Sequence, residues 1–172
     1  MARANKAIKN TSSVNVGFAA HDHTACVQTA LQAAEAHCVA KGLRFTPVRR
    51  RTLEILLQEH RALGAYDLLK SLSASGFGSQ PPVAYRAIDF LVKNGFAHKV
   101  EKLNAFIACN HPGAPHSPAF MICRSCDVVV EGMSGPARGM IGKAANEVGF
   151  KIEKSIIEVE GICGSCAEQA SA

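Results

Sequence analysis

Residues 81–101 read PPVAYRAIDFLVKNGFAHKVE, and this stretch decides the fold of the first part of the chain. Two prolines favour a helix start, and Ala84, Ile88 and Leu91 recur at the spacing of one buried helical face. Gly95 ends that helix. The next residues alternate between apolar and polar side chains, which predicts a strand directly after the helix.

The segments on either side complete the pattern. Helical periodicity predicts a first helix from about residue 25 to Gly42, a second that opens at Thr46-Pro47, and a third from Gly64 to Ser75. A second alternating run reaches Cys109 and forms a hairpin with the first. Short helices followed by a hairpin indicate a winged helix-turn-helix, whose last helix is sized for the major groove of DNA.

Residues 111–116 have the composition of a hinge, and the charge changes sign there. Residues 1–110 carry an excess of Lys and Arg and attract polyanions, whereas residues 111–172 are slightly acidic. The predicted organisation is a mobile arm at 1–24, a DNA-binding domain at 25–110, a hinge at 111–116 and a small domain at 117–172.

The small domain is expected to have a β-β-α-β order. Strands are predicted at 120–123, 128–130 and 150–159, and Ser134 is expected to cap a helix whose inner face holds Ala137, Ile141, Ala144 and Val148. The core of such a unit is too small to stabilise it alone, which favours a metal staple and a partner subunit. The predicted fold class is therefore α+β.

Composition excludes several classes of protein. In 172 residues with a net charge of +5, no apolar run approaches the roughly 20 residues that cross a bilayer. The first residues lack the apolar core of a secretory signal. We therefore expect a soluble, cytoplasmic protein, in whose reducing compartment seven cysteines are metal ligands or buried thiols rather than disulfides.

Two cysteine pairs carry the strongest chemical signal. Cys123-Arg-Ser-Cys126 and Cys163-Gly-Ser-Cys166 each place two thiolates on a tight turn, as a closed tetrahedral zinc site requires. The alternative is a pair of redox-active motifs. Such motifs stand at the start of a helix after a strand, which we do not expect for Cys123 or Cys163. The sequence also lacks a nucleophile elbow, a phosphate loop or a paired acid and base, so we expect no enzyme.

Four segments occur in an order that resembles the ferric uptake regulator family: 44–49 (RFTPVR), 65–69 (AYDLL), 81–91 and 95–101. With the paired cysteines, the resemblance covers residues from about 25 to 167. One departure is Val83-Ala84, where the family commonly has Thr-Val and so a capping hydroxyl. The resemblance implies a metal-dependent repressor that binds double-stranded DNA and dimerises through residues 117–172.

The resemblance also bears on the sensed metal. The iron branch usually carries a His-Asp-His core before the first cysteine pair, and this core is missing here. As in the zinc branch, His98, Cys109, His116 and Glu131 would form the sensing site. This mixture of imidazole and thiolate is softer than shells that suit iron or manganese. Each residue has a plainer alternative: a packed histidine, a small buried thiol or a solvated carboxylate.

One further histidine and one further histidine-containing segment remain as possible metal ligands. His111 is a reserve ligand and is otherwise a solvated loop residue. His21-Asp22-His23 with Cys26 looks metal-like, but in a mobile arm we expect no site there.

For DNA contact, the resemblance points to Tyr66 and Arg86. The guanidinium of Arg86 can reach guanine in the major groove, and Tyr66 can meet a base edge or simply pack. Phosphate contacts are expected from Arg49, Arg50, Arg51 and Lys93. A run of arginines is otherwise a solvated helix face.

The expected function is a zinc-responsive repressor of zinc-uptake genes, bound to a palindromic operator when zinc-loaded. It has structural and regulatory zinc as cofactors, and no membrane or small-molecule substrate as partner. The alternatives are an iron, manganese or peroxide sensor of the same family, or a thiol oxidoreductase.

Overall fold

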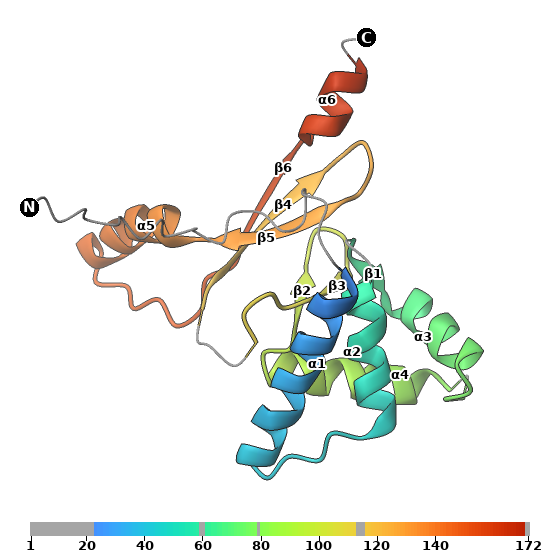
Figure 1. The fold of residues 1–172 in the computed structure, drawn as a ribbon. Helices are drawn as coiled ribbons and strands as arrows, with labels where there is room; N and C mark the ends of the chain where they lie inside the picture. The colour runs from blue at the N-terminus through green and yellow to red at the C-terminus, as the bar shows by residue number, and fades with distance from the viewer. Residues whose placement is uncertain (1–22, 59–60, 79, 113–115, 171–172) are drawn as a thin grey trace, which may run out of the picture.

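Four helices and a hairpin form the first part of the fold in the computed structural model, which describes residues 23–58, 61–78, 80–112 and 116–170 (Figure 1). The helices are α1 (His23–Ala40), α2 (Pro47–Gln58), α3 (Ala65–Ala74) and α4 (Pro81–Lys93). Strands β2 (Ala97–Val100) and β3 (Ala105–Ala108) pair antiparallel, and the short β1 (Leu63–Gly64) pairs with the other edge of β3. This order confirms the winged helix-turn-helix.

Helix α4 begins and ends for local reasons. Its two prolines occupy the first turn, where the missing N–H groups have no partner to lose. At its end Gly95 takes a positive φ of 72°, and the N–H of Phe96 bonds back to the Leu91 carbonyl at 2.9 Å. This glycine turn delivers the chain directly into β2, so the wing stands beside the helix.

One apolar core holds the helices and the hairpin together. It contains the buried faces of α1 to α4, with Leu31, Leu56, Leu72 and Leu91 each at most 1% exposed. Thr52 is buried among them, and its hydroxyl donates to the Val48 carbonyl at 2.7 Å. Because the inner face of α4 is fixed by this core, its outer face is presented to solvent in a fixed orientation.

The second part of the fold is a three-stranded sheet with two helices. Strands β4 (Pro118–Cys123) and β5 (Val129–Met133) pair antiparallel, and β6 (Ile157–Gly161) lies parallel to β4 on its other side. Helix α5 (Gly135–Glu147) connects β5 to β6, and α6 (Gly164–Ala170) follows β6. The β-β-α-β order is as predicted, and the α+β fold class is confirmed.

Two predictions for this part were wrong in detail. The strand expected from residue 150 starts only at Ile157, after an irregular segment. Ser134 precedes α5 but does not cap it, because its hydroxyl donates to the Ser117 carbonyl at 2.7 Å instead.

The face of α5 expected to turn inward is not covered by any residue that the structure describes. Ile141 and Ala144 are exposed, and Val148, just beyond the helix, is 78% exposed. In Figure 1, α5 extends away from the rest of the fold. The side chain of Ala137 lies outside the described part.

A second, smaller core lies between the two parts. Val100 and Ile107 of the wing pack there with Phe120, Ile122 and Val129 of the sheet. Arg61 also forms an isolated bridge with Val128. The wing, together with the residues just before β1, is therefore the part of the helical unit that contacts the second unit.

The N-terminal arm falls almost entirely outside the described residues, as do His21 and Asp22. Among the residues that the structure describes, no helix is both long and apolar enough to span a membrane.

Candidate metal centres and DNA-binding surface

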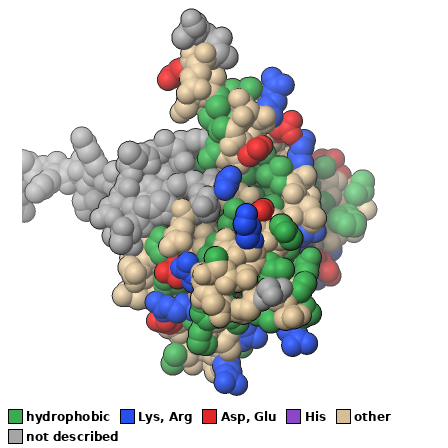
Figure 2. All heavy atoms as spheres, turned by 90° about the vertical axis from the view of Figure 1, so that its right-hand side faces the viewer, with side chains coloured by type: hydrophobic (Ala, Val, Ile, Leu, Met, Phe, Trp, Pro, Cys, Tyr) green, Lys and Arg blue, Asp and Glu red, His purple; other side chains and the backbone are tan. Residues whose placement is uncertain are grey.

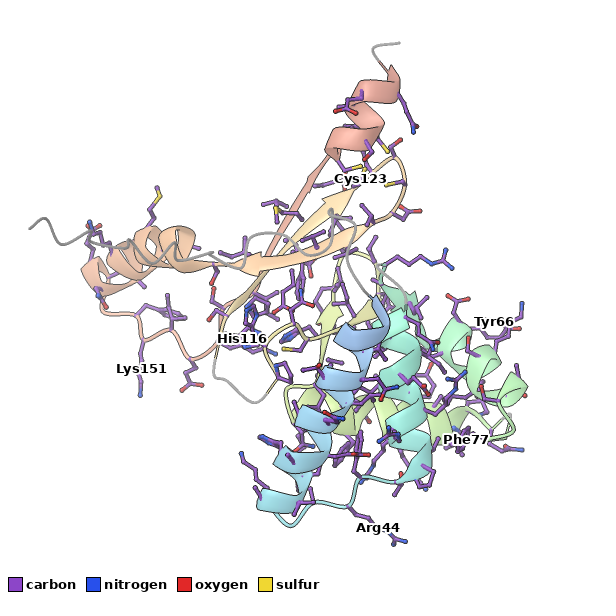
Figure 3. The ribbon with its side chains drawn as sticks, viewed as in Figure 1. Arg44, Tyr66, Phe77, His116, Cys123 and Lys151 are labelled. Atoms are coloured by element: carbon purple, nitrogen blue, oxygen red, sulfur yellow. The ribbon has the colours of Figure 1, made fainter. Side chains whose placement is uncertain are left out.

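Parallel pairing of β4 with β6 brings the two cysteine pairs to one end of the sheet. Cys123 is the last residue of β4 and pairs with Gly161 of β6, so the chain beyond both strands meets at the same edge. Cys126 lies in the turn after β4, while Cys163 and Cys166 lie before and within the first turn of α6. Figure 3 shows Cys123 at the base of α6.

The four sulfurs have the spacing of a tetrahedral site. All lie within 4.8 Å of one another, and Cys126 Sγ is 3.8 Å from Cys163 Sγ. Sulfurs held about 2.3 Å from one tetrahedral zinc stand roughly 3.8 Å apart. The residues present therefore fit a closed four-sulfur zinc site.

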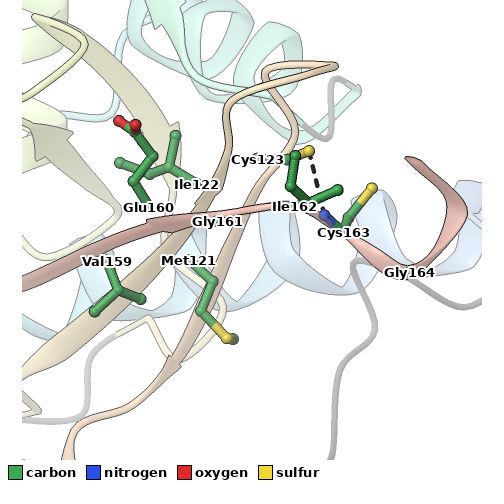
Figure 4. Close-up of a pocket in the computed structure, with 9 residues that line it drawn as sticks. All are labelled: Met121, Ile122, Cys123, Val159, Glu160, Gly161, Ile162, Cys163 and Gly164. Atoms are coloured by element: carbon green, nitrogen blue, oxygen red, sulfur yellow. Dashed lines mark hydrogen bonds between the residues drawn. The ribbon is translucent and has the colours of Figure 1, made fainter. Parts of the chain in front are cut away.

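The backbone around Cys123 favours its thiolate. The Cys163 N–H donates to Cys123 Sγ at 3.3 Å, drawn dashed in Figure 4. This bond, followed by that from the Ser125 N–H, lowers the pKa of Cys123 to about 6. The thiolate is the form that binds a metal.

One prediction that weighed against an oxidoreductase was wrong. The second cysteine pair does stand at the start of a helix after a strand, since Cys163 follows β6 and precedes α6. What distinguishes this site from a redox motif is the convergence of both pairs in one cluster.

The second cluster joins residues from four places in the chain. His98 lies in β2, Cys109 directly follows β3, His116 lies in the connector before β4, and Glu131 lies in β5. The ligand atoms of all four lie within 4.8 Å of one another. Figure 3 shows His116 between the helical part and the sheet, apart from Cys123. This cluster therefore spans both units.

Its distances suit a small cation. His98 Nε2 lies 3.1 Å from His116 Nε2 and 3.4 Å from Glu131 Oε1. His116 Nε2 lies 2.8 Å from the same oxygen and 3.5 Å from Cys109 Sγ. Nitrogen and oxygen ligands at about 2.0–2.1 Å from a tetrahedral zinc stand roughly 3.3 Å apart, so the residues fit zinc.

The environment sets the charge of this cluster. Burial and the nearby Glu131 charge raise the pKa of Cys109 to about 12, against an opposing bond from the His111 N–H. Burial alone would raise the pKa of Glu131, but hydrogen bonds from His98, from the Asn110 N–H and from His116 keep it below its ordinary value. Without a metal, the cluster therefore holds one carboxylate and one protonated thiol.

His111 stands beside this cluster rather than in it. Its ring centroid lies 5.7 Å from that of His116, and its N–H donates to Cys109 Sγ at 3.3 Å. The Asn110 N–H similarly donates to Glu131 Oε2 at 2.8 Å. These two hydrogen bonds were not predicted from the sequence, because both donors are backbone N–H groups and no residue type signals them.

The two expected base-contacting residues are both exposed on the helical unit. Tyr66, in the first turn of α3, is 78% exposed, and Arg86 is exposed on α4. Figure 2 views the molecule from the α3 side and shows Lys and Arg side chains at several points over this part. Tyr85, the neighbour of Arg86 in the sequence, is also 54% exposed, and it was not predicted to contact DNA.

The three arginines of α2 all have partners within the protein. Arg49 stacks over the Phe90 ring at 3.7 Å, Arg50 pairs with Glu35, and Arg51 bonds to Glu54 at 2.8 Å and Ser75 at 3.0 Å. Arg51 is held most firmly, so it is the weakest candidate for a phosphate contact. Lys93 is exposed at the end of α4.

The fold is a winged helix joined to a small β-rich unit. Four cysteines form one cluster within the second unit, and a mixed His, Cys and Glu cluster lies between the two units. These features define a winged-helix protein with two candidate metal centres. The chain is 35% identical to the zinc uptake regulation protein of Escherichia coli (strain K12) over 142 residues, which is 82% of this chain and 83% of that protein. The chain therefore belongs to the zinc uptake regulators of the ferric uptake regulator family.

Solved structures agree with this assignment. A zinc uptake regulator complexed with zinc and DNA is similar with a TM-score of 0.81 and 34% identity, covering 85% of this chain and 98% of that one. The holo form of XcZur has a TM-score of 0.74 and 38% identity, covering 81% and 98%. The ferric uptake regulator of Helicobacter pylori, at 15% identity and a TM-score of 0.53, is similar in fold alone. No protein-family model matches the chain.

Proposed function

We propose that this protein is a zinc-responsive transcriptional repressor that binds a palindromic operator when zinc-loaded and controls zinc-uptake genes. The observation that carries the proposal is the mixed cluster, whose ligands come from both the DNA-binding unit and the second unit. The similar regulator that was solved with zinc and DNA supports the proposal that this protein binds both zinc and DNA. We assign the two units to residues 25–110 and 117–172, with 111–116 as the hinge.

The two clusters have different roles. Cys123, Cys126, Cys163 and Cys166 hold the structural zinc, which ties β4 to the end of β6 and contributes folding free energy to a small unit. His98, Cys109, His116 and Glu131 hold the regulatory zinc. A bound zinc ion supplies bonds that fix the separations of its ligands.

The regulatory ligands connect zinc binding to DNA binding through geometry. His98 and Cys109 move with the wing, whereas Glu131 moves with the β4–β6 sheet. Their convergence selects one angle between the units. In a two-fold dimer, that angle sets the separation of the two α4 helices, which must match half-sites about one helical turn, or a multiple, apart.

The second unit supplies the homodimer contact. This unit exposes more large apolar side chains than we expect of a surface that faces only water. They are Met140, Ile141, Val148, Phe150, Val159 and Ile162. Large exposed apolar patches mark interaction sites. Covering these residues with the same face of a second copy forms the two-fold dimer that a palindrome requires.

On DNA, Arg86 and Tyr66 read base edges. Arg49, Arg50 and Lys93 contact phosphates, and Arg51, which is held by Glu54 and Ser75, contributes least. The location is the cytoplasm, where zinc-dependent repression acts on DNA. A regulator of this kind performs no chemical reaction, so the protein is not an enzyme.

A metal titration of DNA binding tests the proposal. Operator duplexes are first selected from random DNA with zinc-saturated protein, and binding is then measured against buffered free zinc, iron(II) and manganese(II). Zinc at low free concentration is expected to tighten operator binding, and the other two metals to do so only at far higher concentrations. A response to iron, manganese or peroxide in preference to zinc would favour the alternative sensors of the same family.

A further inference from the structure

The second unit holds the turn of the wing at a place apart from the regulatory cluster. In β6, one carboxylate oxygen of Glu158 accepts the Glu101 N–H at 2.6 Å, and the other accepts the Lys102 N–H at 2.9 Å. The Lys102 ammonium also pairs with Glu160 at 2.5 Å. Strand β6 of the dimerisation unit therefore binds the hairpin turn of the DNA-binding unit through hydrogen bonds and an ion pair.

The sheet register explains why this contact and the regulatory cluster lie on one face. Phe120 of β4 pairs with Glu131 of β5 on one side and with Glu158 of β6 on the other. Directly paired residues point to the same face of a sheet. The row Glu131–Phe120–Glu158 therefore faces the wing. Its first member contacts His98, and its middle ring lies 5.8 Å from the His98 ring.

The two carboxylates that reach the wing turn differ in kind. Both contacts are exposed, but Glu158 places both of its oxygens on consecutive backbone N–H groups, a charge-assisted arrangement that is stronger than a neutral bond. Glu160 makes an ion pair whose side chains are 38% and 51% exposed, and such pairs contribute little. Glu158 is thus the anchor, and Glu160 is a natural control two residues away on the same strand.

We propose, on the basis of the zinc-responsive function above, that Glu158 is a positioning residue for regulation. Its carboxylate latches the wing turn to β6 and raises the population of the interdomain angle at which the four regulatory ligands converge. Glu158 contacts neither the regulatory cluster nor the outer face of α4. Its effect on zinc is therefore indirect, since the apparent affinity of a ligand falls with the population of its binding-competent state.

The test compares Glu158→Gln with Glu160→Gln and the wild type. The amide keeps the size of Glu158 but loses its charge and one acceptor. Apparent zinc affinity at the regulatory site is expected to fall about tenfold in Glu158→Gln and to stay within about twofold in Glu160→Gln. Excess zinc should restore operator binding by Glu158→Gln, whereas it would not rescue a misfolded wing.

Unchanged zinc affinity in Glu158→Gln would overturn the proposal, and so would loss of its structural zinc or dimer. Amide hydrogen exchange of the wild type gives a measurement that needs no variant. The N–H groups of Glu101 and Lys102 should exchange more slowly than is usual for the N–H groups of a hairpin turn, and more slowly still when regulatory zinc is bound. Fast exchange both with and without zinc would refute the proposed contact. A wild type whose operator binding ignores zinc would instead refute the proposed function, while slow exchange at the turn would still support the latch.

Discussion

Arg86 and Lys93 stand on the same helix, about two turns apart, yet different roles are expected of them. Arg86→Ala should weaken binding to the operator by about 1–3 kcal/mol, because a bidentate contact to guanine is lost, and should leave binding to random DNA nearly unchanged. Binding to both DNAs is measured at one fixed salt concentration.

Lys93→Ala is the matched control. Losing one phosphate contact should weaken binding to operator and random DNA alike and lower the slope of log affinity against log salt by about one. Equal losses on both DNAs for Arg86→Ala would remove Arg86 from the residues that read bases.

Protonation of Cys109 gives a prediction on pH. With its pKa raised to about 12, chiefly by burial, the thiol of the metal-free protein keeps its proton throughout neutral and mildly basic pH. It must lose that proton to ligate as a thiolate. Regulatory zinc affinity should therefore rise with pH, on the order of tenfold per unit for one proton released.

Competition against a chelator of known pH dependence, from about pH 7.5 to about 9, measures this slope. Cys109→Ser should flatten the pH dependence of zinc affinity, since a serine hydroxyl does not lose its proton in that range. A flat profile in the wild type would show that Cys109 is not a ligand.

At the scale of elements, α5 and the outer face of β6 carry apolar side chains that the described part of the chain leaves exposed. Val159, on the sheet face away from the wing, is 50% exposed. Val159→Lys should dissociate the homodimer, because the charge would be buried in the interface, while the fold of each subunit is retained. Sedimentation velocity measures the dimer, and far-ultraviolet circular dichroism measures the fold.

Val39 on α1, which is 82% exposed, offers a control of the same residue type. Val39→Lys should leave the dimer intact. If Val159→Lys stayed dimeric at micromolar concentration, the dimer contact would have to lie on another surface.

For the whole molecule, the two clusters should separate by mutation. Cys109 and His98 lie outside the four-cysteine cluster, so Cys109→Ser with His98→Ala should keep the structural zinc, the fold and the dimer. Zinc-stimulated operator binding should be lost, because no ligand set then holds one interdomain angle. The loss is bounded by the coupling free energy, commonly about 1–3 kcal/mol.

Zinc content by elemental analysis and operator binding with and without zinc check this result. A double mutant that still tightens on its operator with zinc would place the sensor elsewhere, with His111 next in line. A double mutant that loses its dimer would show that the two clusters form one structural unit.

Removal of the structural zinc should have a different effect. Replacement of all four cysteines by serine is expected to unfold the second unit and dissociate the dimer, because its sheet shares only a small core with the wing. The winged helix, which has its own core, should keep its helices. A four-serine variant with an unchanged melting temperature and dimer would contradict a structural role.

The sequence by itself determined the elements whose signals are local. The spacing of Ala84, Ile88 and Leu91 and the glycine stop at Gly95 required only contacts along the chain, so α4 and the wing were predictable. The cysteine pairs were recognised for the same reason, because each pair lies on one turn. The resemblance to a known family then named the four regulatory residues.

The tertiary structure alone decided what depends on contacts between distant segments. Periodicity marked an apolar face on α5 but could not say whether this chain or a second one covers it, and among the described residues it is exposed. The gathering of the four sulfurs depends on the parallel pairing of β4 with β6, a non-local contact. Glu158 gave no signal at all, because its partners are backbone N–H groups, which every residue except proline carries and which only the fold can bring to a carboxylate.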